Sequence, residues 1–147
     1  MEPGVTALYQ NEIRVWARKV RNDHRLVRPD WTISKTSRLC GSRLTMDLTL
    51  KNDRVAEIGW MARACTLGMA STAIVVEAAP GLTLAEIEAA GQQLHRLLEG
   101  ADVAFNTQWE ALSLFLAARD FPGRHGSIML PFAAAAEATL SQKTPHC

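Results

Sequence analysis

The clearest pattern along the chain is an alternation of apolar and polar residues before its middle. Over 44–51 every second residue is apolar, at Leu44, Met46, Leu48 and Leu50, with polar residues between them. This alternation is typical of a strand with one buried and one wet face. Shorter patterns of the same kind cover 31–36 and 55–62, and the turn residues at 51–54 separate the last two runs. The three runs predict an antiparallel meander.

Helical spacing of apolar residues surrounds this meander. Residues 5–21 have an amphipathic pattern, which predicts a helix before the first strand. After the third strand, residues 66–79 are rich in alanine and other small residues and end at Pro80-Gly81. Thr83 and Glu86 form a capping-box pattern that predicts the start of a further helix, which runs to Gly100.

Three more segments complete the pattern: helices over 109–119 and 127–140 and, between them, a sharp loop over 121–126. Strands grouped together and helices grouped together indicate an α+β fold. We expect a three-stranded antiparallel sheet with an N-terminal helix and several C-terminal helices packed on one face. No internal repeat or linker divides the chain, so residues 1–147 are predicted to form a single domain.

Composition narrows the function. The chain has 147 residues, a net charge of +1 and 48% hydrophobic residues, which fit one globular domain. This balanced charge argues against nucleic acid as a partner. There is no apolar run of about 18 residues and no signal-peptide pattern, so we expect no membrane partner and a cytoplasmic protein. The basic residues at Arg14, Arg18, Lys19, Arg21, Arg25 and Arg28 predict a solvated face, with an acidic docking partner as the alternative.

The cysteines are the main candidates for chemistry. Their number, three, argues against a disulfide framework and favours free thiols, metal ligands or redox groups. Cys40 lies on a glycine turn before one strand, and Cys65 lies at the start of a helix after another, so the meander would bring them together. A helix N-terminus lowers a thiol pKa, and Arg63 and Arg124 are candidates to add positive charge. Cys147, in the tail, is expected to be incidental.

The motifs around these cysteines resemble a known family. Leu39-Cys40-Gly41-Ser42 is similar to a Cys-Gly-Asp motif before a strand, and residues 64–71 (ACTLGMAS) are similar to Cys-Gly-x-Ala-x-Ser-Ala at a helix start. Residues 121–132 (FPGRHGSIMLPF) resemble a later Pro-Ala-Arg-x-x-Cys motif. In this order, the motifs resemble the iron–sulfur cluster assembly scaffolds of the IscU, SufU and NifU N-terminal type, whose fold is SufE/NifU-like.

Two ligand positions of that family are different here. Ser42 stands where the family has an aspartate. The position of the family's third cysteine is occupied by Ser127 when Pro122-Gly123-Arg124 is the anchor of the alignment. It is occupied by Gly126 when His125 is aligned with the histidine that precedes this cysteine in the IscU branch. Serine is a poor substitute because its hydroxyl stays protonated at neutral pH. The chaperone-recognition motif Leu-Pro-Pro-Val-Lys is also absent.

The resemblance implies an assembly scaffold, not an enzyme, that binds an iron–sulfur cluster, iron or zinc through Cys40 and Cys65. His125 is a candidate third ligand, since imidazole binds zinc and, in Rieske centres, iron. The implied partners are a cysteine desulfurase and apo-protein acceptors. Because so few ligands come from one chain, a homodimer is one way to complete the site.

Two alternatives stay open at this point. The first is a metal-free interaction or regulatory module of the same fold that docks a cysteine desulfurase or another assembly component. The second is a sulfur carrier or dithiol protein with Cys65 as the nucleophile. No Ser/His/Asp arrangement, phosphate loop or carboxylate pair supports conventional catalysis.

Overall fold

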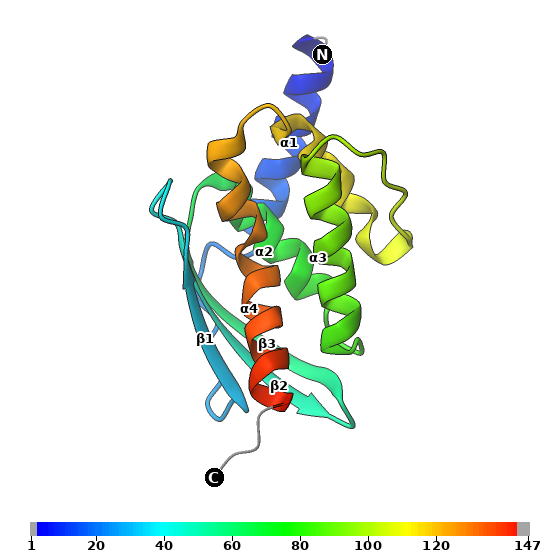
Figure 1. Ribbon diagram of the computed structural model, residues 1–147. Coiled ribbons are helices and arrows are strands. Elements are labelled where there is room, and N and C mark those ends of the chain that lie inside the picture. The colour runs from blue at the N-terminus through cyan, green and yellow to red at the C-terminus, as the bar shows by residue number, and fades with distance from the viewer. Residues whose placement is uncertain (1–2, 144–147) are drawn as a thin grey trace.

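The computed structural model describes residues 3–143 and contains one sheet and several helices (Figure 1). In chain order the elements are α1 (Pro3–Arg18), β1 (Trp31–Thr36), β2 (Arg43–Lys51), β3 (Arg54–Arg63), α2 (Thr66–Ala78), α3 (Leu84–Leu98), the 3₁₀ helices η1 (Thr107–Ala118) and η2 (Pro122–Arg124), and α4 (His125–Lys143). No helix in this range is long and apolar enough to cross a membrane.

The sheet is the predicted antiparallel meander, with strand order β1-β2-β3. Met46 at its centre pairs with Ile33 on one side and Trp60 on the other. Asn52 and Asp53 make the tight turn between β2 and β3, both with positive φ, a conformation that Asn and Asp tolerate better than most residues. The α+β fold class is confirmed.

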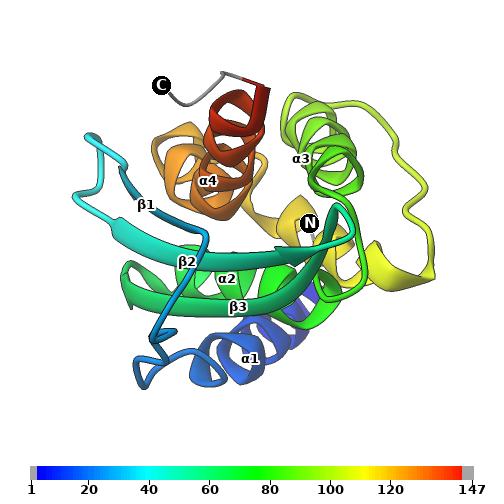
Figure 2. The same cartoon turned by 90° about the horizontal axis from the view of Figure 1, so that it is seen from below.

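Helices cover one face of the sheet (Figure 2). α4 contacts β1 and β2, α2 contacts β3, and α1 and α3 pack outside them on α2 and α4. The apolar row of β2 joins residues from both inner helices in one buried core that includes Leu44, Met46, Leu48, Ile74 and Ile128. This packing sets the start of α2 and the start of α4 beside the β1–β2 turn, at the same end of the molecule (Figure 1, Figure 2).

The helix predictions hold with two differences. Thr83 and Glu86 form both hydrogen bonds of the predicted capping box of α3. Residues 107–118 form a 3₁₀ helix, where the sequence predicts a helix over 109–119. The prediction of a loop over 121–126 is wrong at its end, because Pro122 starts a 3₁₀ turn that leads directly into α4 at His125.

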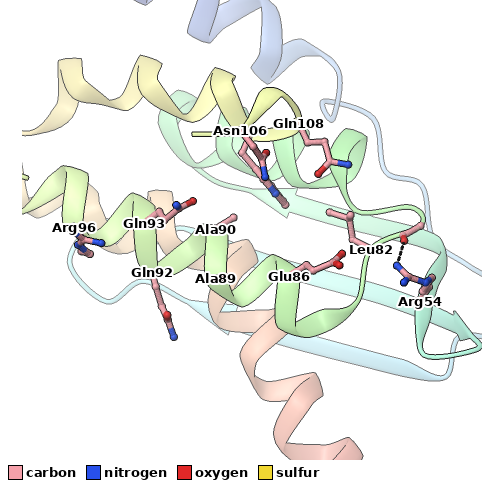
Figure 3. Close-up of a pocket in the computed structure, with 12 residues that line it drawn as sticks. Arg54, Leu82, Glu86, Ala89, Ala90, Gln92, Gln93, Arg96, Asn106 and Gln108 are labelled. Carbon is pink, nitrogen blue, oxygen red and sulfur yellow. Dashed lines mark hydrogen bonds between the residues drawn. The ribbon is translucent and has the colours of Figure 1, made fainter. Parts of the chain in front are cut away.

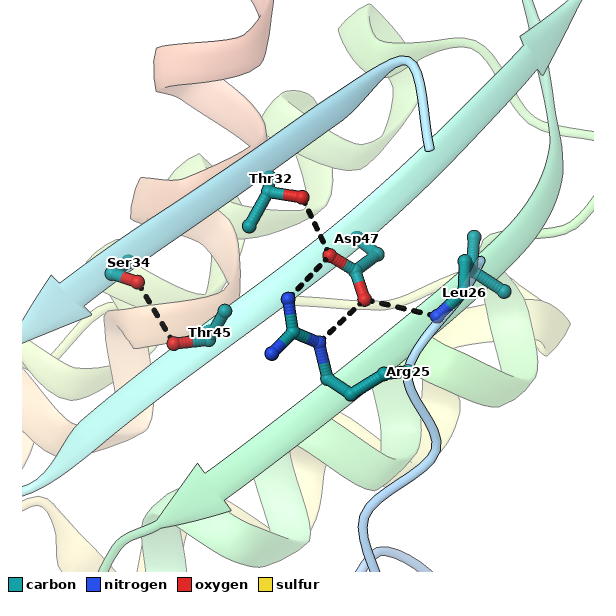
Figure 4. A network of polar contacts seen from close by, with 6 residues as sticks. All are labelled: Arg25, Leu26, Thr32, Ser34, Thr45 and Asp47. Carbon is teal, nitrogen blue, oxygen red and sulfur yellow. Dashed lines mark hydrogen bonds and ion pairs between the residues drawn. The ribbon is translucent and has the colours of Figure 1, made fainter. Parts of the chain in front are cut away.

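The polar residues of β2 predict a solvent-exposed outer face. In the structure another segment of the chain covers this face. Asp47 on this face is fully buried (Figure 4). Its carboxylate accepts two hydrogen bonds from Arg25 (2.7 and 3.1 Å), one from the Leu26 N–H (3.0 Å) and one from the Thr32 hydroxyl (2.7 Å). The segment that precedes β1 therefore lies across the sheet and supplies three of the four hydrogen bonds to this buried carboxylate, and Thr32 of β1 supplies the fourth.

Gly59 on β3 makes room for this covering segment. The backbone of His24 pairs with Trp60 at the outer edge of β3. A Cβ on Gly59 would lie only 2.6 Å from the His24 carbonyl oxygen. The absence of a side chain at 59 thus allows the segment to approach the strand closely.

Candidate functional site

Cys40 lies in the turn between β1 and β2, half-buried among serine hydroxyls. Gly41 has φ +71°, which allows the tight turn, and its N–H donates to the Ser37 carbonyl (2.8 Å). The Cys40 Sγ lies 3.4 Å from Ser37 Oγ and 3.3 Å from Ser42 Oγ. The sequence analysis did not single out Ser37, although a serine three residues before a cysteine in a glycine turn is a readable signal.

Cys65 is the N-cap residue of α2 and is also half-buried. Its Sγ lies 3.3 Å from Ser127 Oγ, at the start of α4, and its backbone N–H donates to Ser42 Oγ (3.2 Å). The Ser127 hydroxyl donates to Ser42 Oγ at 2.9 Å. The structure therefore brings both predicted cysteines into one hydrogen-bonded cluster, and Ser42 and Ser127 link them.

Two glycines allow this cluster to close. A Cβ on Gly68 of α2 would overlap Ser127 Oγ, and a Cβ on Gly126 of α4 would lie 2.8 Å from Ser37 Oγ. The starts of α2 and α4 and the β1–β2 turn can thus meet with their backbones close together. The buried Ser127 consequently has little space around it.

His125 is placed next to the cluster in sequence but bonds elsewhere. Its Nε2 lies 2.9 Å from the Ala118 carbonyl oxygen. Within residues 3–143 no group of three or more His, Cys, Asp or Glu side chains could hold a metal ion together. The role of His125 as a third ligand stays a prediction, and Cys147 lies outside the described residues.

The two arginines predicted near the thiols behave differently. The Arg124 side chain contributes to lowering the pKa of Cys65. Arg63 instead makes a two-bond ion pair with Asp23 at 2.8 and 2.9 Å, so its charge is compensated there. Of these two arginines, Arg124 is therefore the one that favours a thiolate at Cys65.

These surroundings favour thiolates. Hydrogen bonds from the Ser37 and Ser42 hydroxyls lower the pKa of Cys40 to about 7. Burial raises the pKa of Cys65, but hydrogen bonds from Ser127, the Gly68 N–H and Arg124 outweigh burial and lower it. The thiol that is half-ionised near neutral pH is thus Cys40, whereas the sulfur-carrier alternative places the nucleophile at Cys65.

This assignment predicts the pH dependence of alkylation. In a Cys65→Ser/Cys147→Ser variant, iodoacetamide should modify Cys40 with a rate that rises through a midpoint near pH 7. Adding Ser37→Ala should move the midpoint upward, because the hydrogen bond that lowers the pKa of Cys40 most is lost. A midpoint at 9.0, the ordinary cysteine value, in both variants would contradict the assignment.

A large cavity lies away from the thiols. It has a volume of about 700 Å³ and lies beside α3, where polar side chains such as Glu86, Gln93 and Gln108 line it (Figure 3). At one end Arg54 donates to the Gly81 carbonyl (2.9 Å). No cysteine or histidine lines this cavity, so it is separate from the thiol cluster.

Comparison with known proteins agrees with the fold. The family model described as "NifU-like N terminal domain" matches residues 9–124. A solved structure of the N-terminal part of a nitrogen-fixing NifU-like protein from Brucella abortus is 28% identical, with a TM-score of 0.84, over 92% of this chain and 96% of that one.

A second structure has the same fold at lower identity. It is a proposed iron–sulfur cluster assembly scaffold protein for the SUF system, from Fervidobacterium islandicum AW-1. It is 15% identical, with a TM-score of 0.77, over 85% of this chain and 91% of that one. No curated protein matches the chain. Since the family model covers most of the sequence, the chain belongs to the NifU-like N-terminal domain family.

Proposed function

We propose that this protein is a cytoplasmic iron–sulfur cluster assembly scaffold that holds iron or a cluster on the thiolates of Cys40 and Cys65. The observation that supports it best is the single cluster that joins both thiols through Ser42 and Ser127. A pKa of about 7 for Cys40 supplies a thiolate at neutral pH, and thiolates are the ligands that iron–sulfur clusters and zinc use.

Two thiolates are fewer than the four ligands that such cargo normally takes. The rest would come from His125, from a second copy of the chain or from a partner. His125 would first have to release the Ala118 carbonyl. An incomplete ligand set holds its cargo weakly, which suits a scaffold that receives sulfur from a cysteine desulfurase and passes the cluster to apo-proteins.

The test is anaerobic purification followed by analysis of iron, zinc and acid-labile sulfide. The parent should contain iron and sulfide after reconstitution, and Cys40→Ser/Cys65→Ser should lose nearly all of both, because serine does not ionise at neutral pH. Cys147→Ser is the matched control and should keep them. Equal iron and sulfide in the parent and the double variant would refute the proposal.

The metal-free interaction module is the second candidate, and the serine pair favours it. Ser42 and Ser127 satisfy both thiols and each other without a metal. This candidate predicts no iron or zinc in any variant but retained binding to a cysteine desulfurase. Both candidates predict binding in a pull-down with purified desulfurase, so the metal analysis distinguishes them: binding without iron or zinc supports the interaction module, and binding with iron supports the scaffold.

A further inference from the structure

The structure divides the basic residues of α1 and the following segment into two groups. Lys19 forms an ion pair with Glu77 (3.4 Å), and Arg25 binds Asp47. Arg14, Arg18 and Arg21 are exposed, and none of them forms an ion pair with any residue in the described range. Within the described residues these three cationic side chains therefore have no ion-pair partner on α1 and the turn after it, and neither does Arg28 further along the segment.

These three arginines line one pocket of about 330 Å³. The remaining lining residues are uncharged: Ala17, Ala64, Thr66 and Met69. Arg14 and Arg18 lie one turn apart on α1, about 6 Å along its axis, and Arg21 follows in the turn after the helix, so the three guanidinium groups match several anionic groups in a row better than one small ion. Ala64 and Thr66 are the neighbours of Cys65 in the chain, so the pocket borders the backbone on both sides of Cys65.

An apolar pocket of about 290 Å³ adjoins the basic one, since Arg14 and Thr66 line both. Its apolar lining comes from α1, the start of α2, the end of η1 and the residue before η2: Ile13, Leu67, Ala117, Ala118 and Phe121. The Phe121 side chain is 60% exposed. A charged surface thus continues into an apolar one that has an exposed aromatic ring at its side.

We propose that the two pockets form a docking surface for an acidic, amphipathic segment of a partner protein. Its carboxylates would bind Arg14, Arg18 and Arg21, and a large apolar side chain would pack beside Phe121. A partner held there lies next to Cys65, where it can exchange cargo with the thiols. This last step rests on the proposed function, whereas the binding of the segment does not.

The test is fluorescence anisotropy on the metal-free protein with a short labelled peptide of glutamate and leucine in a helical repeat. A matched peptide carries lysine in place of every glutamate. We expect the acidic peptide to bind and the basic one not to bind. The triple variant Arg14→Ala/Arg18→Ala/Arg21→Ala should weaken binding on the order of tenfold, and added salt should weaken binding to the parent.

A second triple variant, Arg28→Ala/Lys51→Ala/Arg96→Ala, removes the same charge outside these pockets and should change the affinity less than about twofold. If both triple variants lost affinity for the acidic peptide equally, the effect would depend on net charge alone and the proposal would be overturned. Binding of the basic peptide, or displacement of the acidic peptide by equimolar inorganic pyrophosphate, would also overturn it.

The apolar half has its own control. Phe121→Ala should weaken binding about fivefold, while Val27→Ala, at a side chain 94% exposed outside both pockets, should not. Because peptide binding is measured on metal-free protein, it tests the docking surface independently of the iron analysis that tests the scaffold function. Peptide binding without iron binding refutes the scaffold function alone, and iron binding without peptide binding refutes the docking surface alone.

Discussion

Replacing Asp47 with alanine is expected to lower the free energy of unfolding by about 3 kcal/mol. The carboxylate is fully buried and accepts four hydrogen bonds. Its loss removes the partners of the Thr32 hydroxyl and the Leu26 N–H and detaches Arg25 from the outer face of β2. Urea denaturation followed by circular dichroism measures the change.

Asp102→Ala is the matched control, since Asp102 is exposed and should change the stability by less than about 0.5 kcal/mol. Asp47→Asn keeps the shape of the side chain and should lower the free energy of unfolding less than Asp47→Ala does. If Asp47→Ala unfolded at the same urea concentration as Asp102→Ala, the segment before β1 would not be anchored by this carboxylate.

The same carboxylate predicts a pH dependence. Burial raises the pKa of Asp47, but the hydrogen bonds from Arg25, Thr32 and Leu26 outweigh it and hold the pKa below the ordinary 3.8. A depressed folded pKa adds stability above the unfolded pKa, which is lost as pH falls below about 4. The stability difference between the parent and Asp47→Asn should therefore shrink in that acidic range.

Adding metal-ligating side chains at Ser42 and Ser127 should have the second large effect, on metal affinity. Ser127→Cys places a third sulfur where Ser127 Oγ lies 3.3 Å from the Cys65 Sγ and 2.9 Å from Ser42 Oγ. With Ser42→Asp as the fourth ligand, zinc affinity should rise at least about a hundredfold, because even outer-shell partners change affinity by roughly 10–100-fold. Competition with a chromophoric chelator measures this affinity.

The control for the added thiol is Ser113→Cys on the exposed side of η1, which should leave the zinc affinity unchanged. The bulkier aspartate of Ser42→Asp is placed at a buried position and can disturb folding. The single variant Ser127→Cys avoids this substitution and should show part of the gain in zinc affinity. Unchanged affinity in both the double and the single variant, with native circular dichroism, would mean that these positions do not face a common metal.

The sequence predicts the framework well because its signals are local. Alternation over 44–51 and the capping pair Thr83/Glu86 depend on neighbours in the chain, and both appear as expected. The placement of Cys40 and Cys65 in one cluster follows from the meander between them.

The parts that sequence analysis missed depend on distant segments. Asp47 is read as a residue of a wet strand face because its partner, Arg25, lies 22 positions earlier in an irregular segment. Arg63 lies next to the thiol motif in sequence but pairs with Asp23, 40 positions away. No periodicity encodes such pairs, since each is decided by how the covering segment packs on the sheet.

The bond between Ser42 and Ser127 joins residues 85 positions apart, and it has a consequence for synthesis on the ribosome. At about 5–20 residues per second, Ser127 is made roughly 4–17 seconds after Ser42. For most of this interval, once Cys65 has been made, the nascent chain holds both cysteines without the Ser127 hydroxyl that links them. The hydrogen-bonded arrangement of the two thiols can therefore form only after the start of α4 has been synthesised.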